Sequence, residues 1–278
     1  MIKPAFRSIG VFDSGVGGFT VLREINRILP NKKLIYLADQ VHVPYGERTL
    51  EEVRMYSKGI VQFLIDQGSA LIVVACNTAS AAALHFLRLE FPDTPIVGME
   101  PAVKPAAEKS RSHKVGVLAT PATFQGELYS SLVERFAKDV KLLQHTCPGL
   151  VRQIEIGELN SQVTRNILES AIQPMLIDGI DTIVLGCTHY PLVMGLINDI
   201  TGGHIKVIDP APAIARRVKN LMETRYIKVS ESETDQITFF TTGDLDKFKW
   251  AVGFFLGIEG KPHNLIWDHE NRNLKFNG

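Results

Sequence analysis

Two short segments of the chain end an apolar run in a cysteine and continue with a polar turn. They are LIVVACNT (71–78) and TIVLGCTH (182–189). Their β-branched runs predict two strands with Cys76 and Cys187 at the carboxyl ends, where open α/β sheets bind ligands. Two matched thiols in such positions suit acid/base chemistry on opposite sides of one small substrate.

A free cysteine is also a common buried apolar residue, and this interpretation fits Cys147. Cys76 and Cys187 instead precede predicted helix starts, whose free N–H groups are expected to lower a thiol pKa from about 8.5. A disulfide between them is less favoured, because the chain has no C-x-x-C motif. Zinc held by both thiols and His189 would lack a fourth ligand and a familiar spacing, so no metal site is predicted.

Two loops follow the first two predicted strands: DSGVGG (13–18) and PYG (44–46). The glycines of the first allow close backbone approach, and its N–H groups can hold a carboxylate or phosphate. It matches neither common nucleotide-binding glycine motif, so it does not indicate a nucleotide site. Either Asp13 or Ser14 is expected to cap the next helix. Because Asp13 would repel an anion, we expect it to face a substrate ammonium or another acid/base group, and Tyr45 to contact a ligand.

Polar residues also follow both candidate thiols. Asn77 and Thr78 come after the first, and Thr188 and His189 after the second. Their hydroxyl, amide and N–H groups could bind both ends of a dicarboxylate, which is compatible with helix capping. His189 is the only histidine beside a candidate thiol, so it could protonate or activate Cys187.

Short apolar strands alternate with amphipathic helices through most of the chain, which predicts the α/β class with parallel sheets and helices on both faces. The expected strands are 9–12, 34–38, 71–75, 96–99, 115–118, 140–143, 182–185, 205–208 and 237–241. The expected helices include 19–29, 50–67, 79–91, 213–226 and 244–256. A polar loop over 228–236 and an irregular tail after the last helix complete the prediction.

A self-comparison at long period indicates an internal duplication. Three segments resemble later ones in the same order: 9–14 with 115–120, 71–78 with 182–189, and 96–102 with 205–211. We therefore predict two similar, pseudo-symmetric domains with mostly parallel sheets and an active site in the cleft between them. The first comprises residues 1–99 plus 209–278, because the C-terminal segment is expected to return to it, and the second comprises residues 100–208.

Composition is that of an ordinary globular protein, with 278 residues, 45% apolar and 22% charged. Thirty Lys+Arg balance 30 Asp+Glu, so no basic surface for nucleic acid or an anionic membrane is predicted. The chain starts without a signal-like apolar run, and no stretch approaches the roughly 20 residues of a membrane-spanning helix. We expect a cytoplasmic protein, in which three cysteines do not indicate a disulfide framework.

At these motifs the chain resembles the cofactor-independent glutamate racemases of the aspartate/glutamate racemase superfamily. The matching stretches are GVFDSGVGG (10–18), VPYG (43–46), ACNTAS (75–80), GCTHYP (186–191) and TTGD (241–244). The similarity extends from about Ile9 to about Gly257, and together these motifs form a specific signature. The resemblance implies two facing α/β domains with glutamate in the cleft and no cofactor. Homodimers are common in the family, although no dimer surface can be recognised in the sequence.

The resemblance also implies roles for individual residues. Cys76 and Cys187 would be the two bases, acting on D-glutamate and L-glutamate respectively. Asp13 would support Cys76, and His189 would support Cys187. Glu155 matches a family carboxylate near the second thiol, although PGLVRQIE around it departs from the usual surroundings. The substrate-binding residues would be Asp13, Ser14, Tyr45, Gly46, Asn77, Thr78, Thr123, Thr188 and His189.

Two regions depart from the family pattern. Gln40 and His42 stand before PYG, where Thr and Arg are common, and Gly126 stands where Ser is frequent after Thr123. These positions concern the rim and the second domain's first loop, so they bear on rate and regulation more than on the reaction.

Racemisation removes the α-hydrogen from one face of the substrate and returns a proton to the other, which a thiolate and a thiol on opposite faces can do. Fixed donors would stabilise the developing enolate-like charge in place of pyridoxal phosphate. By the resemblance, D-glutamate would serve peptidoglycan precursor synthesis. The alternatives are a racemase of aspartate or another amino acid and a non-catalytic amino-acid-binding module. A cysteine hydrolase would leave the second thiol unexplained.

Overall fold

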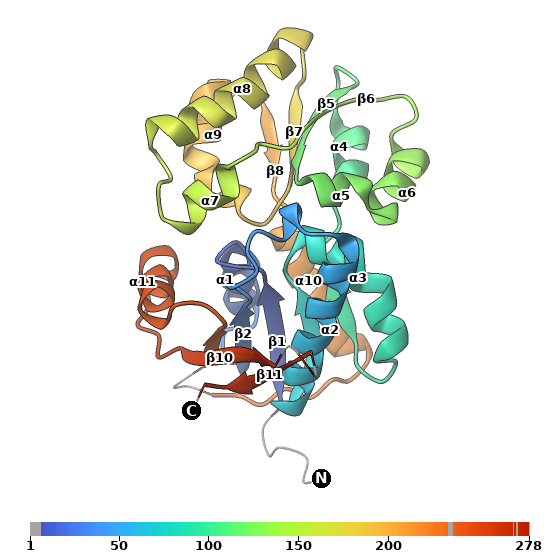
Figure 1. Cartoon of the computed structure of the whole chain (residues 1–278). Coiled ribbons are helices and arrows are strands. Elements are labelled where there is room, and N and C mark those ends of the chain that lie inside the picture. Colours follow the sequence, from blue (N-terminus) through green and yellow to red (C-terminus); the bar gives the residue numbers. More distant parts are fainter. Residues whose placement is uncertain (1–6, 233–235, 269, 271, 278) are drawn as a thin grey trace.

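The computed structural model describes residues 7–232, 236–268, 270 and 272–277, and Figure 1 shows two sheets, one above the other, each surrounded by helices. The strands of the larger sheet are β1 (Ser8–Asp13), β2 (Leu34–Ala38), β3 (Ser69–Val74), β4 (Ile96–Gly98), β9 (Ile237–Thr241), β10 (His263–Asp268) and β11 (Asn273–Phe276). They lie in the order β11-β10-β9-β2-β1-β3-β4. All neighbours are parallel except β10 and β11, which are antiparallel.

The smaller sheet is parallel throughout. Its strands are β5 (Lys114–Ala119), β6 (Lys141–His145), β7 (Thr182–Gly186) and β8 (Lys206–Ile208). Their order β6-β5-β7-β8 repeats the order β2-β1-β3-β4, as the predicted duplication requires. The predicted α/β class with mostly parallel sheets is therefore confirmed.

Helices cover both faces of the larger sheet. They are α1 (Phe19–Ile28), α10 (Ala211–Thr224) and α11 (Leu245–Leu256) on one face, and α2 (Leu50–Asp66) and α3 (Asn77–Glu90) on the other. We call this sheet and these helices the first lobe. Its core includes Phe19, whose ring centroid lies 4.8 Å from that of Tyr36 and 5.8 Å from that of Phe248. Helix α2 starts at a capping box, in which Thr49 and Glu52 satisfy each other's backbone N–H groups.

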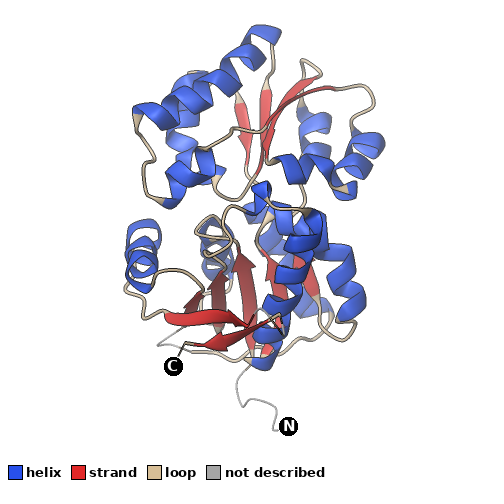
Figure 2. Cartoon of the chain, viewed as in Figure 1, coloured by secondary structure: helices blue, strands red, loops and turns tan. Residues whose placement is uncertain are grey.

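The second lobe is the smaller sheet with its own helices. They are α4 (Val103–Lys109), α5 (Pro121–Gln125), α6 (Glu127–Phe136), α7 (Leu150–Glu155), α8 (Gln162–Asp178) and α9 (Met194–Thr201). Helices α8 and α9 pack on one face of the sheet, and α4 and α6 on the other. Two 3₁₀ turns, η1 (Tyr45–Glu47) and η2 (Tyr190–Val193), follow β2 and β7. Figure 2 shows that loops and helix ends, rather than strands, lie where the lobes meet.

The C-terminal segment departs from the prediction, because the expected irregular tail contains β10 and β11. Each strand has one fully or nearly buried leucine, Leu265 or Leu274, among exposed and polar neighbours. One buried position per strand is too short a pattern for alternation to stand out in the sequence. Of the predicted loop 228–236, residues 233–235 lie outside the described part of the chain. Strands β9 to β11 belong to the larger sheet, while the domain boundaries remain a prediction.

Within the described ranges, no helix is both long enough and apolar enough to cross a lipid bilayer.

Candidate active site between the lobes

A small cavity lies where the loops after β1, β2, β3, β5 and β7 meet. Its lining is Ser14, Pro44, Tyr45, Gly46, Cys76, Asn77, Thr78, Thr120, Val151, Cys187, Thr188 and His189. Cys76 comes from the first lobe and Cys187 from the second, so the two thiols share one cavity. The enclosed space is about 10 Å³, enough for roughly one water molecule. In this conformation the volume is too small for an amino acid.

Cys76 occupies the N-cap of α3, directly after β3. Its sulfur accepts a hydrogen bond from the backbone N–H of Ala79 at 3.5 Å, and the carboxyl group of Asp13 is its ionisable neighbour. Burial raises the pKa of Cys76 well above its ordinary value, and the charge of Asp13 raises it further. The expectation of a lowered pKa at this thiol is therefore wrong, because the favourable N–H contact is outweighed by the loss of solvation.

Asp13 ends β1 and is fully buried behind Cys76. Its Oδ2 accepts a hydrogen bond from the N–H of Gly18 at 2.7 Å, and Oδ1 has no partner among the described residues. Burial raises the pKa of Asp13, while the charge of His189 and the interaction with Cys76 oppose the shift. Carboxyl and thiol thus form a buried pair, both of whose members hold protons more tightly than in water.

Cys187 has a different partner. Its sulfur lies 3.8 Å from Nδ1 of His189, whose Nε2 lies 2.5 Å from Oε1 of Glu155. Burial lowers the pKa of His189, but the hydrogen bonds and charges of Cys187 and Glu155 outweigh it and place the pKa well above 6.5. These contacts with Cys187 and Glu155 favour the protonated form of His189. The predicted helix start after Cys187 is instead the 3₁₀ turn η2. The polar partner of this thiol is therefore His189 and not an α-helix N-terminus.

Glu155, at the end of α7, connects the second lobe to the first. Its Oε1 accepts a hydrogen bond from the N–H of Val16 at 2.8 Å, and its Oε2 accepts one from Nε2 of Gln40 at 3.3 Å. Gln40, one of the departures from the family pattern, therefore contacts this carboxylate. Glu155 does not line the cavity but holds His189 from behind.

The glycine loop after β1 presses its backbone against these side chains. A Cβ atom on Gly15 would lie 1.9 Å from Oε1 of Glu155, and one on Gly17 would lie 2.4 Å from Nδ1 of His189. Neither position can carry a side chain without displacing the group it touches. The glycines thus allow contact between lobes, and no phosphate-binding role is needed to explain them.

Tyr45 lines the cavity and donates a hydrogen bond from its hydroxyl to Oδ2 of Asp39 at 2.6 Å. Asp39 is fully buried and also accepts hydrogen bonds from Thr242 and Trp267 at 2.9 and 2.8 Å. His42 contacts the same carboxylate through Nδ1 at 2.9 Å. Asp39 was not predicted as a site residue from the sequence, although it follows β2 as Asp13 ends β1.

Three hydroxyl groups form a chain at the cavity wall. Oγ1 of Thr120 lies 2.8 Å from that of Thr78 and 2.9 Å from that of Thr123. Thr123, predicted to bind substrate, lies behind Thr120 rather than at the cavity. Thr120 is the counterpart of Ser14 in the internal repeat, and this correspondence is the sequence signal that points to Thr120.

The side-chain amide of Asn77 is buried at the cavity, yet neither its oxygen nor its nitrogen has a hydrogen-bond partner in the described structure. Buried polar groups are rarely left unpaired, so this amide is available to a ligand.

Comparisons with known proteins point to one family. The family described as Asp/Glu/Hydantoin racemase matches residues 9–218. A glutamate racemase of Roseiflexus sp. is 49% identical over 249 residues, 89% of this chain and 92% of that protein. The structure of Escherichia coli glutamate racemase with L-glutamate and the activator UDP-MurNAc-ala matches with TM-score 0.82 and 32% identity, covering 92% of this chain and 97% of the other. Francisella tularensis glutamate racemase with D-glutamate matches with TM-score 0.80 and 28% identity, covering 92% and 95%.

Proposed function

The chain belongs to the Asp/Glu/hydantoin racemase family, and from that premise we propose that it interconverts L-glutamate and D-glutamate. The observation that carries the proposal is the placement of Cys76 and Cys187 at one cavity, from opposite lobes. Each thiol has its own ionisable partner: Asp13 for Cys76, and His189 with Glu155 for Cys187. This arrangement suits proton removal on one face of a carbon atom and proton delivery on the other.

In the direction from L to D, Cys187 acts as thiolate and removes the α-proton, while Cys76 acts as thiol and donates its proton to the opposite face. The substrate gains and loses one proton, and the thiolate ends on Cys76. The reverse direction starts from that state. The raised pKa of Cys76 supports its role as the proton donor, and the imidazolium of His189 supports a thiolate at Cys187. Each acid/base step contributes about 10²–10⁴-fold.

Donors around the cavity bind the substrate. We assign the two carboxylates to the hydroxyls of Ser14, Thr78 and Thr188, to the amide of Asn77 and to the free N–H groups at the start of α3. Tyr45 and Gly46 also line the cavity. Fixed donors in a site closed to water stabilise the negative charge that develops at the substrate carboxylate when the α-proton leaves.

A serine series in deuterated water tests the mechanism. Cys76→Ser and Cys187→Ser should each abolish racemisation of both isomers, followed by circular dichroism of glutamate, whereas the wild type should incorporate deuterium at the α-carbon. Cys147→Ser is the matched control, because this buried thiol lies outside the lining of the cavity and should leave racemisation intact. Full activity in either single variant, or an α-hydrogen retained through turnover, would exclude the two-base scheme.

The biological role rests on the family resemblance. We propose that the product D-glutamate supplies peptidoglycan precursors in the cytoplasm and that the enzyme acts as a homodimer. Rescue of a bacterial strain that requires D-glutamate tests the first statement, and sedimentation of the purified protein tests the second. Initial rates with L-aspartate measure how narrow the substrate range is.

A further inference from the structure

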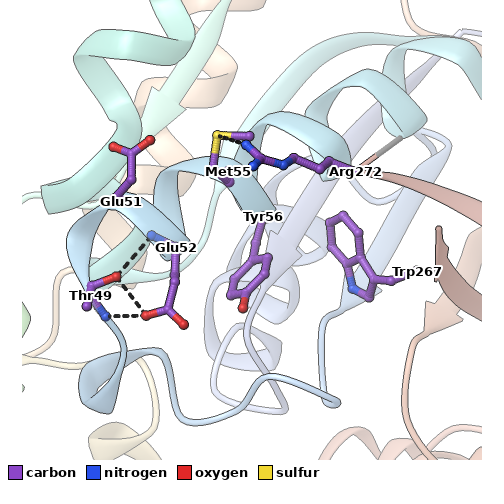
Figure 3. Close-up of a pocket in the computed structure, with 7 residues that line it drawn as sticks. All are labelled: Thr49, Glu51, Glu52, Met55, Tyr56, Trp267 and Arg272. Carbon is purple, nitrogen blue, oxygen red and sulfur yellow. Dashed lines mark hydrogen bonds between the residues drawn. The ribbon is translucent and has the colours of Figure 1, made fainter. Parts of the chain in front are cut away.

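A second, larger cavity lies between the first turns of α2 and the β10–β11 hairpin (Figure 3). It encloses about 410 Å³, within the range of small-molecule sites. Its walls include Glu52, Met55, Tyr56, Trp267 and Arg272, none of which lines the cavity between the thiols. Nothing in the proposed racemase reaction accounts for this cavity.

Two aromatic rings form one wall of the cavity. The centroids of Tyr56 and Trp267 are 5.7 Å apart, and the far face of Tyr56 stacks on His42 at 3.8 Å. Gly59 lets the hairpin lie directly on α2, since a Cβ there would come within 2.7 Å of the carbonyl oxygen of Arg272 and 2.8 Å of the Trp267 ring. The fold therefore places the two rings next to each other, and their planes, tilted by 55°, offer apolar surface to an aromatic ligand.

One cationic side chain at the rim, that of Arg272, has no anionic partner among the described residues. Among the described residues, the only hydrogen bond from the exposed Arg272 side chain goes to Sδ of Met55 at 3.5 Å, and a thioether is a weak acceptor. Glu52, in contrast, already accepts hydrogen bonds from the N–H and hydroxyl of Thr49. Figure 3 shows the Arg272 and Thr49–Glu52 groups at different sides of the aromatic pair. A guanidinium in this state is suited to a carboxylate or a phosphate.

We propose that this cavity binds a small, flat anion, with an aromatic ring against Tyr56 and Trp267 and a carboxylate or phosphate on Arg272.

The site connects to the thiol cavity through one carboxylate. Trp267 donates a hydrogen bond to Asp39. Tyr56 stacks on His42, which also contacts the Asp39 carboxylate. The same carboxylate accepts the hydrogen bond from the hydroxyl of Tyr45. A ligand that shifts the two rings shifts the anchor of Tyr45. On the basis of the proposed function, binding therefore changes the racemisation rate, by about fivefold or more.

Binding can be measured without turnover. The chain has two tryptophans, so Trp250→Phe leaves Trp267 as the sole tryptophan reporter. The probes are 3-phenylpropionate for the carboxylate source and adenosine 5′-monophosphate for the phosphate source, with 3-phenylpropanamide and adenosine as uncharged counterparts. At least one acid should change Trp267 fluorescence with a Kd on the order of 1 mM or tighter, and its uncharged counterpart should bind at least about tenfold more weakly. The acid that binds identifies the source.

Arg272→Gln should weaken binding of that acid at least about tenfold, because a charge-assisted hydrogen bond is lost. Arg217→Gln is the matched control: it removes an exposed arginine of α10 whose side chain bonds Asn220, and it should leave binding unchanged. Equal binding of acid and uncharged counterpart, wild-type binding by Arg272→Gln, or no binding of either acid would overturn the proposal.

Trp267→Phe separates binding from coupling, because it keeps an aromatic ring and loses the hydrogen bond to Asp39. Calorimetry should show that the acid still binds to this variant, while its effect on racemisation disappears. Binding to the wild type without any rate effect would refute the coupling. A chain that bound the acid but racemised no glutamate would instead refute the proposed function, so the two failures are distinguishable.

Discussion

Replacement of Gly17 by alanine tests whether contact between the lobes positions His189. The new Cβ would lie 2.4 Å from Nδ1 of His189, against 3.4 Å or more in ordinary contacts, so the ring must retreat by about 1 Å. It has little room, because its Nε2 lies 2.5 Å from Glu155, which is itself bonded to the N–H of Val16. The 3.8 Å contact between His189 and Cys187 is therefore lost. Misplacement by about 1 Å costs on the order of 10²-fold in rate.

The assay is racemisation of L-glutamate and of D-glutamate, followed by circular dichroism. Since each turnover uses both thiols, Gly17→Ala should lower kcat about 10²-fold in both directions. Gly195→Ala in α9 is the matched control, because its Cβ would meet nothing within 4 Å. It should keep wild-type activity and gain up to about 1 kcal/mol in helix stability. A folded Gly17→Ala protein with kcat within about threefold of wild type would refute this account of His189.

Three further predictions concern pH and stability. Because the pKa of His189 is raised, its imidazolium form is fully present below pH 6.5 and is lost as pH rises through the pKa of the folded protein. We therefore expect kcat to fall on the alkaline side of the pH profile. An unchanged alkaline limb in His189→Gln would contradict this prediction. Burial raises the pKa of Asp181, but hydrogen bonds from Ser112 and its neighbours outweigh it and lower the pKa to about 2. The stabilisation from the Asp181 carboxylate is present above pH 3.8 and is lost as pH falls through about 2. Asp181→Asn should lower the free energy of unfolding in urea at neutral pH by about 1–3 kcal/mol. An unchanged urea midpoint would contradict this stabilising role of Asp181. Phe19→Ala should lower the free energy of unfolding in the same measurement by about 3–5 kcal/mol, because it leaves a cavity in the aromatic cluster between α1, β2 and α11. A decrease below about 1 kcal/mol would show that the neighbouring side chains fill this cavity.

Much of the fold is readable from local pattern. Parallel strands buried on both faces are continuous apolar runs, and the runs ending at Asp13, Cys76 and Cys187 were placed correctly because each stops at a polar loop. The hairpin of β10 and β11 was missed because it buries few side chains and depends on α2 and β9 for its position. The position of this hairpin is set by contacts between residues far apart in the sequence, and hydrophobic periodicity does not reveal such contacts.

The chemistry of the site divides in the same way. Residue types and their order after the strands indicated which groups surround the cavity, including both thiols. The protonation behaviour of Cys76 could not be foreseen, since it depends on how completely Asp13 and the thiol are removed from water. The role of Asp39 also depends on the tertiary structure, because it accepts hydrogen bonds from both Tyr45 and Trp267. These two residues are 222 positions apart in the chain.

Local sequence thus determines which strands and helices form, since hydrophobic periodicity and glycine or capping residues act over a few positions. It also determines, through the duplication, that two thiols stand at equivalent strand ends. Folding of the whole chain decides how the two halves meet: which glycine admits which side chain, how far each ionisable group is desolvated, and which distant donors converge on one carboxylate. These properties depend on distance and burial in three dimensions, and a linear pattern contains neither.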